Sequence, residues 1–187
     1  MKLQNKRIAI LATDGFDHSE LFEPLKALKE EGARVDIVSV KTGEIRSWKG
    51  NNWGESIPVS VLVNQVRSSD YHALVLPGGV ANPDLMRTHE DALIFIRSFF
   101  DDHKPVAAIC HAPWLLISAG VIENRTVTSY YSIKDDVINA GAKWVDRPVV
   151  VDNGLVTSRK PDDLPAFIDK IIEEVREGKH KEQVVDA

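Results

Sequence analysis

The sequence is poor in the residues that build disulfide, metal and nucleotide sites. It contains one cysteine, Cys110, so no disulfide can form within the chain. The histidines other than His111 are scattered, without HxxxH spacing or a second cysteine nearby, which argues against a metal site. No GxGxxG, GKS or GKT pattern is present, so no phosphate-binding loop is expected. We therefore expect neither a metal nor a cofactor.

An excess of positive charge and long apolar runs are also absent. Lys and Arg number 23 against 28 Asp and Glu, and the formal net charge of -5 disfavours a general nucleic-acid-binding surface. No apolar run approaches the ~20 residues that span a bilayer. Residues 1–7 contain no apolar region of a signal peptide. These features favour a reducing, cytoplasmic location, with no membrane partner and no specific nucleic-acid partner.

What the sequence does contain is an alternation of short apolar runs and amphipathic stretches. An uninterrupted apolar run at residues 8–12 predicts a central strand covered on both faces, and short stretches rich in apolar and β-branched residues predict further strands at 35–40, 71–76 and 104–110. Apolar residues at helical spacing predict helices near residues 18–31, 90–103, 113–119, 133–140 and 162–176. Antiparallel excursions are predicted at residues 45–61, at the sheet edge, and at 149–158, with a short strand at 127–129.

This order predicts one α/β domain over residues 1–187. Helices that alternate with parallel strands cover both faces of a sheet, which gives a three-layer α/β/α sandwich with hairpins at the sheet edges. The charged residues 177–187 are expected to form a frayed tail.

Cys110 lies where a predicted strand turns into a helix. Such a strand–turn–helix junction is the geometry of a nucleophile elbow, which lifts a nucleophile above the carboxyl edge of a sheet. Pro113 in the next turn marks the helix start. The positive end of a helix favours thiolate over thiol, so we expect Cys110 to be reactive near neutral pH.

Three chemically useful segments are predicted to meet at the same edge of the sheet. They are the loop and helix start that carry Asp17 and Glu20, the pair Gly78-Gly79, and Cys110-His111. Each follows a core strand, and parallel α/β sheets bind ligands at the carboxyl ends of their strands. The glycines permit close approach of backbone N–H groups, which suits an oxyanion hole. Burial of Glu20 beside the sulfur would raise its pKa and let it donate a hydrogen bond to a thiolate.

Each residue also has an ordinary structural explanation. A lone cysteine is commonly a small buried apolar side chain, and His111 can be a polar residue at a helix start. As neighbours in sequence, Cys110 and His111 pair directly only if the turn bends suitably. Glu20 and Asp84 each lie near a helix start, where the dipole favours an acid whatever its role.

Several motifs resemble one known family. They are Ala-Ile-Cys-His-Ala-Pro at 108–113, Leu-Pro-Gly-Gly at 76–79, Ser-Glu-Leu at 19–21, Ile-Lys-Asp-Asp-Val-Ile-Asn-Ala-Gly-Ala at 133–142, and Val-Val-Val-Asp with Leu-Val-Thr-Ser-Arg at 149–159. Together they resemble the PfpI family of the ThiJ/PfpI superfamily, in order from about residue 7 to residue 172. The resemblance implies a flavodoxin-like, class I glutamine amidotransferase-like domain over the whole chain.

The resemblance also implies roles for individual residues. Cys110 matches the family nucleophile, Glu20 the acid that contacts it, and His111 the histidine that follows it. Asp84 falls where PfpI-type members place an acid that reaches the histidine of a neighbouring subunit, in a dimer or larger homo-oligomer. Two positions depart from the family pattern: Ala112 replaces a usual glycine, and Asp84 replaces a longer glutamate after an apparent one-residue insertion near Asn82.

The resemblance leaves three functions open. The first is a cysteine-dependent stress-response enzyme, of deglycase or glutathione-independent glyoxalase type, acting on α-oxoaldehydes or their protein and nucleic-acid adducts. The second is an intracellular cysteine peptidase with an intersubunit triad of Cys110, His111 and Asp84. The third is a redox-sensing or chaperone-like protein in which Cys110 is oxidised without turnover. A thiol beside a carboxylic acid suits both aldehyde and amide chemistry, and the first function is favoured because no extended substrate groove is evident.

Overall fold

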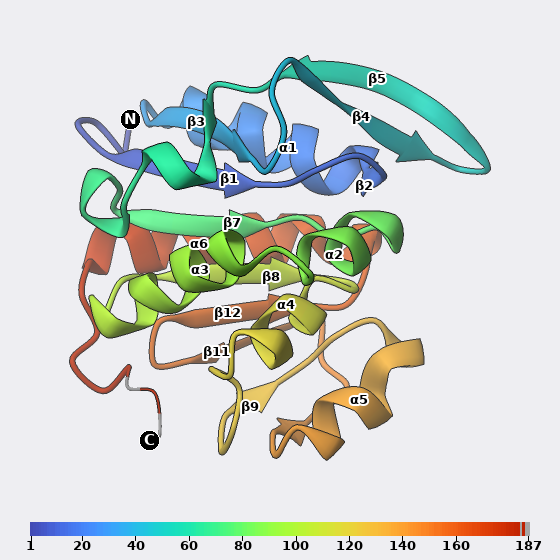
Figure 1. Cartoon of the computed structure of the whole chain (residues 1–187). Helices are drawn as coiled ribbons and strands as arrows, with labels where there is room; N and C mark the ends of the chain where they lie inside the picture. The colour runs from blue at the N-terminus through green and yellow to red at the C-terminus, as the bar shows by residue number, and fades with distance from the viewer. Residues whose placement is uncertain (184, 186–187) are drawn as a thin grey trace.

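The core of the protein is a seven-stranded sheet, described here from a computed structural model that covers residues 1–183 and 185 (Figure 1). The strand order is β11-β12-β8-β7-β1-β3-β6, and within this sheet, as far as the structure describes it, only the β11–β12 pair is antiparallel. The strands are β1 Arg7–Leu11, β3 Arg34–Ser39, β6 Val61–Leu62, β7 Ala73–Leu76, β8 Val106–Ile109, β11 Val149–Asp152 and β12 Leu155–Ser158. The mostly parallel sheet with an edge hairpin confirms the prediction.

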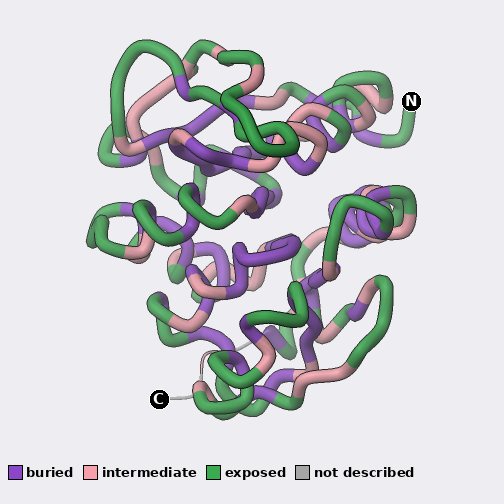
Figure 2. The backbone as a smooth tube through the Cα atoms, turned by 90° about the vertical axis from the view of Figure 1, so that its right-hand side faces the viewer, coloured by how far each residue is buried: buried purple, intermediate pink, exposed green. Residues whose placement is uncertain are grey.

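Helices cover both faces of this sheet and complete three layers. Successive residues of a strand point to opposite faces, so each central strand serves two cores. Ile8 and Ile10 pack with α1 (His18–Glu30) and α6 (Leu164–Glu177). Ala9 and Leu11 belong to the core formed with the other helices, α2 (Ala81–Met86), α3 (Glu90–Asp101), α4 (Pro113–Ser118) and α5 (Lys134–Asn139). The buried chain concentrates between these layers (Figure 2).

The predicted excursion at residues 45–61 is antiparallel, but most of it belongs to a separate sheet. β4 (Glu44–Lys49) pairs with β5 (Asn52–Pro58) and with β2 (Phe16–Asp17), and the hairpin projects beyond the main sheet (Figure 1). β6 then joins the main sheet beside β3. A two-stranded parallel pair forms from β9 (Thr126–Val127) and β10 (Lys143–Trp144).

The beginning of the expected frayed tail packs against the molecule instead. The backbone N–H of His180 donates to the carbonyl of His103 at 2.9 Å, and Gln183 is fully buried. Residues 178–183 therefore do not fray, because this contact holds them against the loop that precedes β8. Residues 184, 186 and 187 of the expected tail lie outside the described part of the chain.

The strand order brings three loops together. β8, β7 and β1 are neighbours in the sheet and run parallel, so the segments that follow their carboxyl ends share one edge. These segments carry Cys110, Gly78 and Glu20. Within the described residues, no helix is both long and apolar enough to cross a membrane.

Candidate active site

Cys110 occupies a strained turn directly after β8. Its φ of 64° lies in the left-handed region, which a residue other than glycine rarely adopts. Hydrogen bonds hold the turn from both sides: the Cys110 N–H donates to Ser158 at 3.0 Å, and the Cys110 carbonyl accepts from the Tyr130 N–H at 2.9 Å. The side chain is 7% exposed. The structure therefore contains the tight strand-to-helix turn that the sequence predicts.

The first turn of α1 delivers Glu20 to this place. Asp17 caps the helix, and its Oδ1 accepts from the N–H groups of Ser19 at 3.0 Å and of Glu20 at 3.2 Å. The cap fixes where the helix begins, so its third residue points inward. Glu20 is fully buried, and its Oε2 accepts a hydrogen bond from the Gly78 N–H at 2.8 Å.

Glu20 and Cys110 interact as two buried acids. Burial, and next the nearby charge of Asp17, raises the pKa of Glu20 to about 8. Burial raises the pKa of Cys110, and the Glu20 carboxylate raises it further. The raised pKa of Glu20 agrees with the sequence prediction. The expected thiolate disagrees with the structure: only the short helix α4 follows Cys110, after His111 and Ala112, and burial raises the pKa of the thiol.

The two glycines after β7 have different tasks. A Cβ on Gly78 would lie 2.5 Å from Glu20 Oε2 and 2.7 Å from Cys110 Cβ, so only glycine fits between these side chains. The Gly78 N–H is engaged with Glu20 and is not free for an oxyanion, which corrects part of the predicted role. The N–H groups of Gly79 and His111 act on the Cys110 sulfur and lower its pKa, against the larger effect of burial. These two donors lie where they can stabilise a negative charge at the sulfur, and the Gly79 N–H also acts on the Glu20 carboxylate.

His111 contacts Cys110 despite being its sequence neighbour. Its Nδ1 lies 3.1 Å from Cys110 Sγ, and its Nε2 lies 3.1 Å from Ser132 Oγ. The ring stacks on Tyr130 with centroids 4.9 Å apart. Burial lowers the pKa of His111, so the imidazole is neutral near pH 7. A neutral ring that accepts the Cys110 thiol proton at Nδ1 carries its own proton on Nε2 and donates it to Ser132.

Within the described chain, Asp84 is not among the hydrogen-bond partners of Glu20 or His111. It is exposed on α2 and lines a pocket of about 300 Å³ with Gly15, Trp48, Trp53, Val80 and Ala81. The described chain places the Ser132 hydroxyl, not the Asp84 carboxylate, on His111 Nε2. A triad that includes Asp84 therefore requires a second subunit and stays a prediction.

Asn82 is a positioning residue that the sequence analysis did not assign. It is fully buried, its Nδ2 donates to the carbonyls of Pro77 and Gly78, and its Oδ1 accepts from the Thr13 N–H. It thus fastens the glycine loop to the segment after β1. An asparagine directly before Pro83 and three residues after the glycine pair was the available signal.

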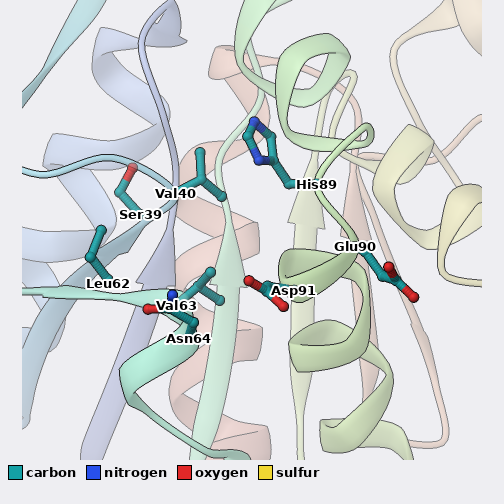
Figure 3. A pocket seen from close by; sticks show the side chains of 8 residues that line it. All are labelled: Ser39, Val40, Leu62, Val63, Asn64, His89, Glu90 and Asp91. Carbon is teal, nitrogen blue, oxygen red and sulfur yellow. The ribbon is translucent and has the colours of Figure 1, made fainter.

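Two further pockets open on the carboxyl side of the sheet. One has a volume of about 300 Å³. It is lined by Tyr130 and Tyr131 from one loop, by Trp144, and by Arg159 and Lys160, which follow β12. Tyr130 also stacks on His111, so this pocket adjoins the site. The other, of about 260 Å³, lies at the ends of β3 and β6 against the start of α3, where Glu90 points away from its interior (Figure 3). Cys110 lines neither pocket.

Comparisons with known proteins give the family. The sequence model described as the DJ-1/PfpI family matches residues 6–174. A protein named as a deglycase in Thermococcus kodakarensis is 43% identical over 170 residues, which cover 91% of this chain and 99% of that protein. General stress protein 18 of Bacillus subtilis is 44% identical over 163 residues, covering 87% of this chain and 93% of that protein.

The fold comparison agrees. The crystal structure of Drosophila melanogaster DJ-1beta superposes with a TM-score of 0.82 at 29% identity, covering 95% of this chain and 92% of that chain. A family match over nearly the whole length, together with these relatives, establishes that the chain belongs to the DJ-1/PfpI family.

Proposed function

We propose that the protein is a cysteine-dependent enzyme of deglycase or glyoxalase type, which acts on α-oxoaldehydes or on the adducts that they form with proteins and nucleic acids. The observation that carries this proposal is the buried pair of Cys110 and Glu20, with two backbone N–H groups directed at the sulfur. The relative named as a deglycase supports the same class of reaction.

The proposed reaction begins with addition of the thiol to an aldehyde carbon. The S–C bond forms as the C=O π bond breaks, and the Cys110 proton moves to Glu20. The N–H groups of Gly79 and His111 stabilise the new oxyanion until Glu20 returns the proton and completes a hemithioacetal. Glu20 then moves the C1 proton to C2 through an enediol while the hydroxyl proton on O1 passes to O2, which gives the thioester of a 2-hydroxy acid. Water adds to the thioester carbonyl and the S–C bond breaks, which releases the 2-hydroxy acid and returns a proton to the Cys110 sulfur.

Burial of the site favours a small reacting group. Cys110 is 7% exposed, so a bulky group cannot reach the sulfur without movement of the chain. A free two- or three-carbon α-oxoaldehyde, or its adduct on a protruding side chain or base, fits this restriction. An extended peptide fits it less well.

The proposal is tested by methylglyoxal consumption with detection of lactate. The wild-type chain is compared with Cys110→Ser, Glu20→Gln and, as a matched control, Glu23→Gln on the exposed face of the same helix. We expect Cys110→Ser to abolish turnover, Glu20→Gln to reduce kcat roughly 100-fold or more, and Glu23→Gln to match the wild type. Turnover that survives Cys110→Ser, or none in the wild type, overturns the proposal.

A peptidase is the second candidate because Asp84 lines a pocket of its own. Trp48, Trp53, Val80 and Leu85 are exposed around Asp84, which suits contact with another copy of the chain. Such a copy would place Asp84 near the neighbouring His111 and complete a triad. Cleavage of a fluorogenic peptide, lost on both Cys110→Ala and Asp84→Ala, would establish this function, and cleavage that survives Asp84→Ala would exclude the triad.

A redox sensor is favoured less by this site. Peroxide oxidises the thiolate, and burial raises the pKa of the Cys110 thiol and limits access to it. Mass spectrometry after mild peroxide treatment is expected to find little sulfinic acid at Cys110. Rapid and complete oxidation would favour the sensor.

A further inference from the structure

A cluster of ligand-type side chains lies at the opposite end of the sheet from Cys110. Glu174 and Glu177 are on the last turns of α6, and His180 follows where the chain turns back. The His180 N–H donates to the carbonyl of His103, in the loop that enters β8, whereas Cys110 follows the exit of the same strand. The cluster is therefore separated from the proposed active site by the length of β8.

The side-chain atoms of this cluster converge on one point. One carboxylate oxygen from each glutamate and one ring nitrogen of His180 all lie within 4.8 Å of one another. His180 Nε2 and Glu174 Oε2 are only 2.9 Å apart. Among the described residues neither atom has a hydrogen-bond partner, although both are buried and lie close together. A simple ion pair with a hydrogen bond does not explain this arrangement.

Burial makes the unsatisfied atoms informative. Glu174 is 5% exposed, and among the described residues its Oε2 has the His180 ring nitrogen beside it but no hydrogen bond. A buried carboxylate oxygen without a hydrogen bond is costly unless a cation neutralises it. The spacing fits a shared cation: with the two atoms 2.9 Å apart, an ion about 2.0–2.2 Å from both would lie to one side of the line between them. Glu177 is exposed, which leaves an entry path from solvent.

A second buried polar side chain lies beside the same cluster. Gln183 is fully buried, and within the described part of the chain neither its Oε1 nor its Nε2 has a hydrogen-bond partner. A Cβ on Gly154, in the β11–β12 turn, would lie 2.6 Å from Gln183 Oε1 and 2.9 Å from His180 Cδ2. Glycine at this turn therefore leaves room for both side chains, and the unpaired amide oxygen stands next to the ring that carries the proposed ligand nitrogen.

We propose that Glu174, Glu177 and His180 bind a divalent transition-metal ion of the zinc class. One imidazole nitrogen and two carboxylate oxygens form a set that suits Zn²⁺ or Co²⁺ better than Mg²⁺ or Ca²⁺, which prefer oxygen ligands alone. The site joins the end of α6 to the chain that follows it. The bound ion therefore has a structural role, because it holds residues 178–183 against the loop that contains His103.

Metal binding is measured on the full chain by calorimetry with Zn²⁺ and by the visible absorption of bound Co²⁺. A Cys110→Ser background removes the one competing thiol. We expect one ion per chain, with affinity reduced roughly tenfold or more by Glu174→Gln, by Glu177→Gln and by His180→Ala. Glu173→Gln, one residue away on the exposed face of α6, is the matched control and should bind as the parent does.

A second readout separates metal binding from folding. Lys179 and Lys181 flank His180, so trypsin cleavage there reports whether the tail is held. We expect Zn²⁺ to slow cleavage in the parent and in Glu173→Gln, but not in His180→Ala. Absence of binding, binding that all three ligand variants leave unchanged, or equal affinity for Ca²⁺ and Zn²⁺ would overturn the proposal.

Discussion

Glu20 and Cys110 are two acids that burial keeps protonated, and this makes Glu20 the residue that sets the pH dependence. The pKa of Glu20 is raised to about 8, so only the ionised fraction above neutral pH can accept the thiol proton. We expect kcat/KM for methylglyoxal to rise as pH increases through about 8 and then to level off. If instead the rate is already level at pH 7, neutral His111, whose pKa is lowered, is the base.

The same residue is expected to lower stability as the pH rises. The unfolded chain ionises Glu20 near its ordinary pKa of 4.5, whereas the folded chain keeps the proton until about pH 8. Below pH 4.5 Glu20 is protonated in both states, so it does not lower the stability of the fold. Between pH 4.5 and about 8, ionisation of Glu20 in the unfolded chain favours unfolding. Glu20→Gln removes this effect. Its change in the free energy of unfolding, relative to the wild type, should therefore be about 3 kcal/mol more favourable at pH 7 than at pH 4.

Urea unfolding of both proteins at several pH values measures this difference. The difference between Glu20→Gln and the wild type should grow from pH 4.5 to pH 8 and stay constant above that. A constant difference across the whole range would mean that Glu20 is not buried with a raised pKa in solution.

Gly78 is required by the close approach of Glu20 and Cys110. Gly78→Ala would put a methyl group 2.5 Å from Glu20 Oε2 and 2.7 Å from Cys110 Cβ, so one of these groups must move. We expect a loss of about 3 kcal/mol in stability and loss of turnover. Gly50→Ala is the control, since nothing lies within 4 Å of its Cβ and its φ of 60° alone costs about 1 kcal/mol. Equal losses of stability in Gly78→Ala and Gly50→Ala would show that Gly78 is not crowded by Glu20 and Cys110.

At the scale of elements, the start of α1 controls the electrostatics of the site. The Asp17 charge is the second-largest cause of the raised pKa of Glu20, after burial, and the Asp17 side chain also caps the helix. Asp17→Asn keeps an acceptor for the cap but removes the charge, so the midpoint of the pH–rate profile should move to lower pH with stability nearly unchanged. Asp17→Ala removes both the charge and the helix cap, so it should also lower the free energy of unfolding by about 1 kcal/mol.

Calorimetric unfolding and pH–rate profiles of the two variants separate these roles. If Asp17→Asn leaves the midpoint of the pH–rate profile unchanged, the Asp17 charge does not raise the pKa of Glu20.

The elements that sequence could predict are those with a strong local pattern. β1, β3, β7 and β8 are short and rich in apolar, mostly buried residues, and the amphipathic α3 and α6 lie within a few residues of their predicted positions. The convergence of Glu20, Gly78 and Cys110 followed from the rule that parallel strands share a carboxyl edge. That rule needs only the order of elements along the chain.

The parts that sequence did not predict depend on contacts between distant segments. The pairing of β4 with β2, the contact of Ser132 with His111, and the docking of the tail on His103 have no periodic signal. The protonation of Cys110 was also beyond the pattern, because the helix dipole is visible in sequence whereas the depth of burial is not.

At the scale of the whole molecule, the exposed apolar side chains around Asp84 predict self-association. Trp48, Trp53, Val80 and Leu85 are 40–57% exposed, and a charge placed among them should oppose burial against another copy. Leu85→Glu should therefore reduce the mass measured by light scattering toward the 20.8 kDa of one chain. Ile94→Glu, at an equally exposed apolar position on α3, is the control and should leave the mass unchanged.

Dissociation also separates the two candidate activities. Glu20, Cys110 and His111 come from one chain, so a dissociated Leu85→Glu protein should still convert methylglyoxal, whereas a peptidase triad that borrows Asp84 from a neighbour should be lost. Loss of both activities on dissociation would mean that a second copy orders the site. A wild-type mass equal to one chain would exclude the intersubunit triad outright, because Asp84 then has no neighbouring His111 to reach.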